Sequence, residues 1–157
     1  MKTAFTAFLL LAGLTAPAWA RLGEGADQIA DRYGIVLTKE IEKPAPGRIA
    51  ALVETFQKNG FSITVTLING ASAAESFKKL NGSSFSSEEQ QTLLAANADS
   101  HSWQAPQNVN GRKQWTRDDG SVATLSGGTV LTIISADMLA AESQAKQLES
   151  SPSLQGF

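Results

Sequence analysis

Residues 49–80, IAALVETFQKNGFSITVTLINGASAAESFKKL, decide the fold. Apolar residues occupy alternate positions from Phe61 to Leu67, which is the two-residue period of a strand with one apolar face. Asn59-Gly60 and Asn69-Gly70 stand at the two ends of this strand. Asn-Gly is typical of the tight turns that join antiparallel strands, because both central residues need positive φ. The segment therefore predicts a three-stranded antiparallel meander.

The residues before the meander predict a short helix and an extended segment. In residues 22–34 the apolar side chains recur at helical spacing, and Gly34 is suited to the left-handed stop of a helix. Residues 35–41 are rich in β-branched side chains and predict an extended conformation. Two prolines in residues 43–47 predict a loop before the meander begins.

The residues after the meander repeat this order. Ser86 and Glu89 have the spacing of a capping box and predict a helix that ends near Asn97. Short strands are expected at 103–105, 112–117, 121–125 and 129–135, separated by turn sequences. Ser135 can cap a last helix over residues 136–149. Its predicted apolar stripe consists of Met138, Ala141, Ala145 and Leu148.

Helices and strands in separate runs predict an α+β domain with an antiparallel sheet. We expect two helix-plus-antiparallel-meander units, residues 21–82 and 83–149, with the last helix at the end of the second. The two units would form a single domain over residues 21–149, followed by a flexible tail at 150–157.

The first 20 residues predict an export signal. Lys2 supplies the positive start, an uncharged run covers residues 4–14, and Ala18-Trp19-Ala20 is a small-x-small cleavage site. The run is too short to span a bilayer. We therefore expect cleavage after Ala20 and a periplasmic or secreted bacterial protein without a membrane span.

Composition excludes several classes of site. The chain has no cysteine, which excludes disulfides, thiol nucleophiles and cysteine-based metal sites. It has one histidine, so a metal site would depend mainly on carboxylates. The formal charge of −2 argues against nucleic acid as a partner. We expect no cofactor and no metal.

The candidate binding residues are Trp103, Lys113, Trp115 and Arg117. Alternation along residues 112–117 places Lys113, Trp115 and Arg117 on one face of a strand. A tryptophan between two cations is unusual for a core face and favours a half-exposed face or a charged edge strand. Such a face could stack on a sugar ring or bind an acidic partner. The alternative is that both tryptophans are partly buried sheet residues.

Two other polar clusters favour ordinary structural roles. His101 lies in a serine-flanked segment and is expected in a solvated loop. The alternative is a small hydrolase that uses His101 with an acid such as Asp99. Asp118-Asp119-Gly120 is expected to form a hairpin turn, because adjacent carboxylates do not reach across a glycosidic bond.

Several short motifs resemble known groups of proteins. The opening Arg-Leu-Gly-Glu at residues 21–24 and Arg-Tyr-Gly at 32–34 resemble a group of uncharacterised exported bacterial proteins, as does the sequence at 115–120. The glycine-opened helix followed by a meander is similar to the outer-membrane-assembly lipoproteins of the SmpA/OmlA type. Two such units in tandem resemble the β-lactamase inhibitor protein. Unlike these proteins, the chain has neither a lipobox cysteine nor disulfides.

The sequence as a whole favours a non-enzymatic protein-binding or interaction module. Its partner would be another envelope or extracellular protein. An envelope structural component and a small hydrolase are the alternatives.

Overall fold

The computed structural model describes residues 21–45 and 48–150. Eight strands form one sheet in the order β1-β2-β3-β4-β8-β7-β6-β5, and every neighbouring pair is antiparallel. The first group of strands is β1 (Thr38–Glu42), β2 (Ala51–Lys58), β3 (Phe61–Ile68) and β4 (Ala71–Lys79). The second group is β5 (Gln107–Val109), β6 (Arg112–Thr116), β7 (Val122–Ser126) and β8 (Val130–Ile134).

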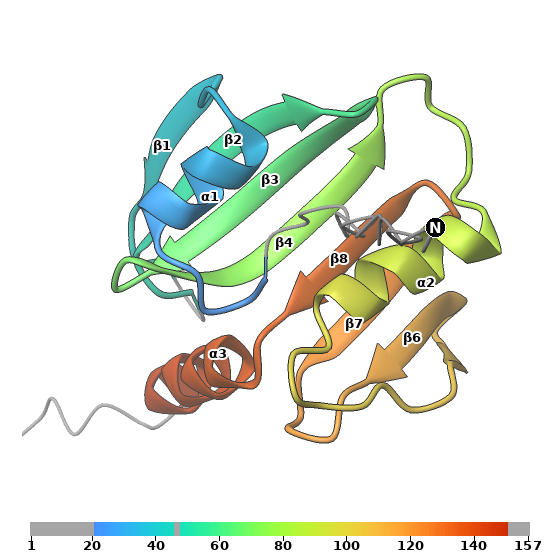
Figure 1. Ribbon diagram of the computed structural model, residues 1–157. Helices are drawn as coiled ribbons and strands as arrows, with labels where there is room; N and C mark the ends of the chain where they lie inside the picture. Colours follow the sequence, from blue (N-terminus) through green and yellow to red (C-terminus); the bar gives the residue numbers. More distant parts are fainter. Residues whose placement is uncertain (1–20, 46–47, 151–157) are drawn as a thin grey trace, which may run out of the picture.

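Two of the three helices cover the same face of this sheet. Helix α1 (Ala26–Tyr33) lies over the first four strands and α2 (Ser87–Ala96) over the last four (Figure 1). The core between helices and sheet contains Ile29 and Tyr33 from α1 and Leu93 and Leu94 from α2. It also contains Phe56, Ile63, Val65, Phe77, Trp115, Leu131 and Ile133 from the strands. The expected α+β class with an antiparallel sheet is therefore confirmed.

Local sequence determined the turns and caps as expected. Asn59 and Asn69 have φ of 50° and 53°, and the glycine after each also has positive φ. These values suit the Asn-Gly turns that join β2 to β3 and β3 to β4. The backbone N–H of Glu89 donates to Ser86 Oγ, and Glu89 Oε2 accepts from the Ser86 N–H. The predicted capping box is thus present at the start of α2.

Three sequence-based expectations are corrected. The first meander has four strands, because residues 38–42 pair with β2. The strand expected at 103–105 is only a single bridge from Trp103 to Arg117, and the paired strand begins at Gln107. Leu148 does not belong to a buried stripe, since it is 78% exposed.

Helix α3 (Ala136–Ser150) differs from the other two helices in position. It begins directly after β8, where the Met138 N–H donates to Ser135 Oγ, so the predicted cap is present. Its first turns line a pocket with Ile68, at the end of β3, and Ala73, near the start of β4. None of the helices in the described residues combines the length and apolar character that crossing a membrane requires.

Candidate binding surfaces

The four predicted binding residues lie together, beneath and beside α2. Lys113 Nζ lies 4.8 Å from the ring centroid of Trp115, and the Arg117 guanidinium lies 5.6 Å from that of Trp103. Trp115 is 6% exposed and Arg117 is 7% exposed. The expectation of a half-exposed face is therefore wrong for these two residues, because α2 covers this side of β6. The edge of the sheet on this side is formed by β5 rather than β6.

Arg117 and Trp103 connect the end of α2 to the sheet. The guanidinium of Arg117 donates to the Asn97 carbonyl at 2.5 Å and to both carboxylate oxygens of Asp119 at 2.9 and 2.6 Å. The Trp103 indole N–H donates to the Leu94 carbonyl at 2.7 Å. The bonds to Asn97 and Leu94 both end on carbonyls at the C-terminus of the helix, where the last carbonyls lack their usual partners within the helix; the Leu94 carbonyl also accepts from the Asn97 N–H. The contacts are those of a structural anchor.

His101 is paired with Asp118 and not with Asp99. Its Nδ1 lies 2.5 Å from Asp118 Oδ1, and the Ser102 N–H donates to Asp118 Oδ2. The Ser102 amide and His101 together lower the pKa of the Asp118 carboxyl. In the described part of the chain, no hydroxyl hydrogen-bonds to the His101 ring. The pair therefore lacks the nucleophile that a serine hydrolase needs.

The same turn carries the one candidate metal group found among the described residues. Ligand atoms of His101, Asp118 and Asp119 lie within 4.8 Å of one another. However, both oxygens of Asp119 accept hydrogen bonds from Arg117, which holds the pKa of this carboxyl far below its usual range. A metal ion here would have to displace or approach a guanidinium cation. The donor set does not suit a cation, and Asp118-Asp119-Gly120 forms the hairpin turn predicted from the sequence.

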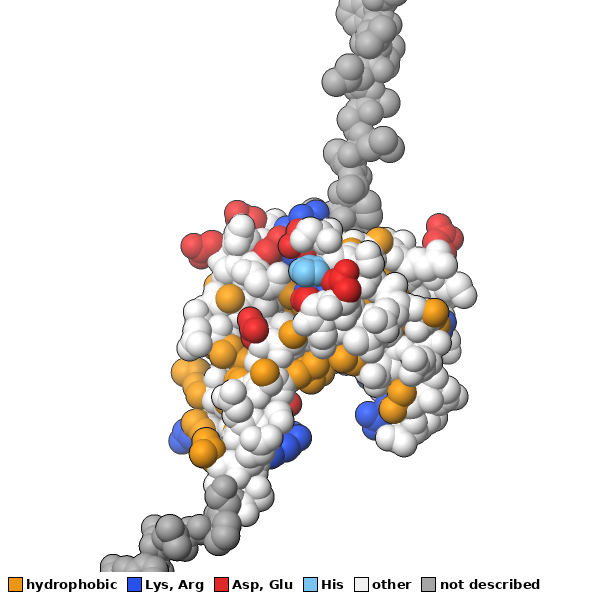
Figure 2. Space-filling model, turned by 90° about the horizontal axis from the view of Figure 1, so that it is seen from below, with side chains coloured by type: hydrophobic (Ala, Val, Ile, Leu, Met, Phe, Trp, Pro, Cys, Tyr) orange, Lys and Arg blue, Asp and Glu red, His pale blue; other side chains and the backbone are white. Residues whose placement is uncertain are grey.

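The opposite face of the sheet is the larger candidate surface, and we call it the open face. Neither α1 nor α2 covers it (Figure 1). Figure 2 shows the molecule from below, hollowed between two limbs with hydrophobic side chains on the roof of the hollow. One limb ends at α3. The hollow therefore lies between α3 and the far end of the sheet, on the side away from the other two helices.

Uncharged polar side chains cross the open face in one continuous row. The register places one such residue on every strand, each directly beside the next. This polar row consists of Thr38, Thr55, Thr64, Ser76, Thr132, Thr124, Gln114 and Gln107. Strands lie about 4.8 Å apart, so the row is about 34 Å long. Its six central members are half-buried, and Ser76 and Thr132 are hydrogen-bonded at 3.1 Å.

A second row runs beside the polar row and is mainly apolar. Its members in the register are Val53, Thr66, Ala74, Ile134, Val122 and Thr116. No charged residue occurs in these six positions, although charged side chains are the usual occupants of a solvated surface. The row ends at the exposed Glu40 of β1, which pairs with Val53. The centre of the open face therefore combines neutral hydrogen-bonding groups with small apolar ones.

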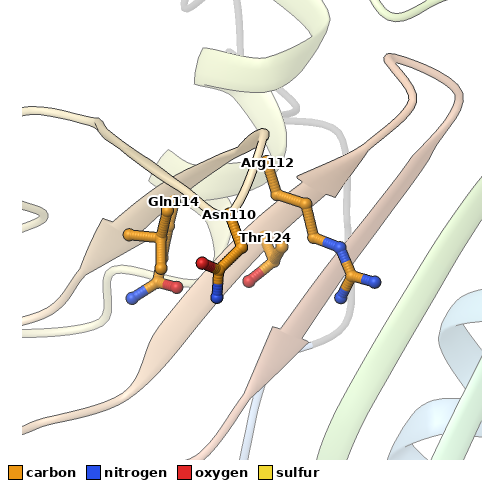
Figure 3. A pocket seen from close by; sticks show the side chains of 5 residues that line it. Asn110, Arg112, Gln114 and Thr124 are labelled. Atoms are coloured by element: carbon orange, nitrogen blue, oxygen red, sulfur yellow. The ribbon is translucent and has the colours of Figure 1, made fainter.

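A shallow pocket lies at one end of the open face. It is lined by Asn110, Arg112, Gln114 and Thr124, with Val109 beside them. Figure 3 shows the labelled side chains on one side of the strands, with Arg112 reaching over the neighbouring strands. The predicted alternation of β6 is thus confirmed, because Arg112 and Gln114 lie on the face opposite Lys113 and Trp115. Arg112 provides a cation at this end of the polar row.

Comparison of the chain with protein-family models, with curated proteins and with solved structures finds no match.

Proposed function

We propose that this protein is an exported, non-enzymatic binding protein that binds a partner protein through the open face. The observation that carries the proposal is the polar row. A solvated sheet face is ordinary in antiparallel sheets, but it is normally kept soluble by charge. The cores of protein interfaces, in contrast, are depleted of charged residues. The centre of the open face, from Thr55 to Gln114 along the polar row, is half-buried and neutral, and it fits the second description.

The partner is proposed to be another envelope or extracellular protein that inserts an uncharged segment into the hollow. Threonine and serine hydroxyls both donate and accept, so the row can pair with backbone amides and carbonyls alike. Val53, Val122 and Ile134 in the second row supply the apolar contact that such an insertion needs. The export signal on which this location depends lies in residues 1–20, outside the described residues.

We also propose that the two halves of the chain are tandem units. Each has a helix followed by four strands, α1 with β1–β4 and α2 with β5–β8. Their last strands, β4 and β8, pair with each other at the middle of the sheet. The order of strands on the two sides of this pair is the same when read outward, which supports the proposal.

The proposed function is tested with two matched variants of the mature protein that starts at Arg21. Thr64→Lys with Thr132→Lys puts two charges into the polar row, whereas Gln91→Lys puts one on the exposed side of α2. Circular dichroism establishes that both variants are folded. Tagged proteins are then used to capture partners from envelope and culture extracts.

We expect the wild type and Gln91→Lys to capture at least one protein that the double variant does not capture. Capture that survives the two lysines would refute the open face as the binding surface. The absence of any protein specific to the wild type would refute a protein partner.

A further inference from the structure

The two edges of the sheet are built differently. At one edge, β5 has only three residues, Gln107–Val109, and it leads into the pocket-lining turn at Asn110. At the other edge, β1 has five residues, and among the described strands it pairs only with β2. An edge strand presents unpaired N–H and C=O groups that can pair with another strand. β1 is the longer of the two edges, and all five of its residues are exposed, as are the three residues of β5.

Large hydrophobic side chains are exposed beside this edge. Six large hydrophobic residues are exposed in the described part of the chain, and three of them, Ile35, Leu37 and Ile41, fall within seven positions. Ile41 is 79% exposed and Leu37 is 53% exposed. Lys39 and Ile41 are two residues apart in β1 and so share one face of the strand, and Leu37 directly precedes the strand at the same spacing. Such a group at an edge strand is an open pairing site.

The one cation on this face of β1 is drawn away from the edge. Lys39 Nζ lies 2.9 Å from Oε1 of Glu54, a residue of β2 that is 2% exposed. The ion pair neutralises Lys39 and directs its side chain across β2. Leu37 and Ile41 therefore remain as the uncovered side chains on this face of the edge.

We propose that β1 is a self-association edge, at which two copies of this chain pair antiparallel about a two-fold axis and extend the sheet. A two-fold interface needs a surface that is complementary to itself. When the axis passes Lys39, Leu37 of each copy lies opposite Ile41 of the other. Thr38 then lies opposite Glu40, and each Lys39 remains neutralised by its own Glu54.

Neighbouring registers are less favourable. An axis at Glu40 sets two exposed carboxylates directly opposite each other and pairs Ile41 with Lys39, which is destabilising. An axis at Thr38 pairs Leu37 with Lys39, and it needs pairing back to Ile35, whereas the axis at Lys39 needs pairing back only to Leu37, the residue directly before β1. The axis at Thr38 would also set Ile35 against Ile41, but Ile35 lies three residues before β1, whereas the register at Lys39 sets Leu37, one residue before β1, against Ile41.

Disulfide trapping tests this register without background, because the chain has no cysteine. Directly opposed residues in antiparallel strands have Cα atoms about 4.5–5.5 Å apart, within the range for a disulfide. The double variant Thr38→Cys with Glu40→Cys is expected to oxidise to a covalent dimer. In either single variant the two thiols are diagonal neighbours, about 7–8 Å apart, and cross-linking should be at least about tenfold slower. Equal rates in the single and double variants would overturn the register.

The association itself is measured by sedimentation equilibrium. Ile41→Lys is expected to raise the dimer Kd at least about tenfold. The two-fold symmetry repeats the contact between Leu37 of one copy and Ile41 of the other, so the substitution removes two such contacts. Val109→Lys, a matched change on the opposite edge, should leave Kd unchanged. A wild-type protein that stays monomeric up to millimolar concentration would overturn the proposal. This outcome is independent of partner capture by the open face.

Discussion

Glu75 makes the stability of this protein depend on pH in an unusual direction. It lies on β4 in the middle of the sheet, directly between Val65 of β3 and Ile133 of β8, and it has no exposed surface. Ser72 Oγ donates to its Oε1 at 3.3 Å, whereas Oε2 has no hydrogen-bond partner. A buried carboxylate with an unpartnered oxygen is costly in its charged form.

Burial raises the pKa of Glu75 from 4.5 to about 7. The Glu24 carboxylate adds to this effect, while the nearby Asn97 side chain, the hydrogen bond from Ser72 and the charge of Arg32 lower the pKa. The folded state therefore holds a proton that the unfolded state loses between these two pH values. The free energy of unfolding should fall as pH rises from about 4.5 to about 7, by up to roughly 3 kcal/mol.

The perturbation is Glu75→Gln, which removes the charge and keeps the shape. Urea denaturation of the wild type and the variant is compared from pH 4 to pH 8. At pH 8 the variant should be more stable by up to about 3 kcal/mol, and at pH 4 the two should be close. Glu88→Gln, an exposed change on α2, is the control and should keep the wild-type slope. If the difference in the free energy of unfolding between Glu75→Gln and the wild type stayed constant from pH 4 to pH 8, a proton held by buried Glu75 would be refuted.

Three further predictions concern the anchors of the fold, and each is measured as the free energy of unfolding in urea. Arg117→Met should cost roughly 2–3 kcal/mol, because it leaves Asp119 and a helix carbonyl without their buried donor. An unchanged stability would show that this anchor contributes nothing. Ser86→Ala should cost about 1 kcal/mol by removing the cap of α2, and a neutral result would contradict the capping contact. Phe77→Ala should cost roughly 3–5 kcal/mol, whereas Leu148→Ala on the exposed side of α3 should stay within about 0.5 kcal/mol, and similar costs at both positions would contradict the assigned core.

The parts of the fold that depend on neighbouring residues could be predicted from the sequence. The turns after Lys58 and Ile68 follow from Asn-Gly, since few other residue pairs accept positive φ at both central positions. The capping box at Ser86 likewise depends on two residues three positions apart. The pairing of β4 with β8 joins residues more than 50 positions apart. No local pattern specifies such a pairing.

The candidate binding residues could likewise be predicted only as far as neighbouring residues determine their placement. Alternation correctly separated the two faces of β6, but it did not show which face α2 would cover. The cations beside Trp115 suggested exposure, because a charge is rarely buried unless it is paired. Arg117 is buried because Asp119, two residues away, pairs with it. Ser62, Thr64 and Thr66 were the local sign of a polar face on β3, and the polar row itself exists only through the register of all eight strands.

The most direct test of the open face as the binding surface is site-specific photo-cross-linking in living cells. A photoreactive amino acid is placed at Thr124 in the polar row and, in a separate strain, at Gln91 on the exposed side of α2. Adducts are identified by mass spectrometry. The account predicts a defined protein adduct from position 124 and none from position 91. An adduct from position 91 alone, or the absence of any adduct from position 124, would contradict it.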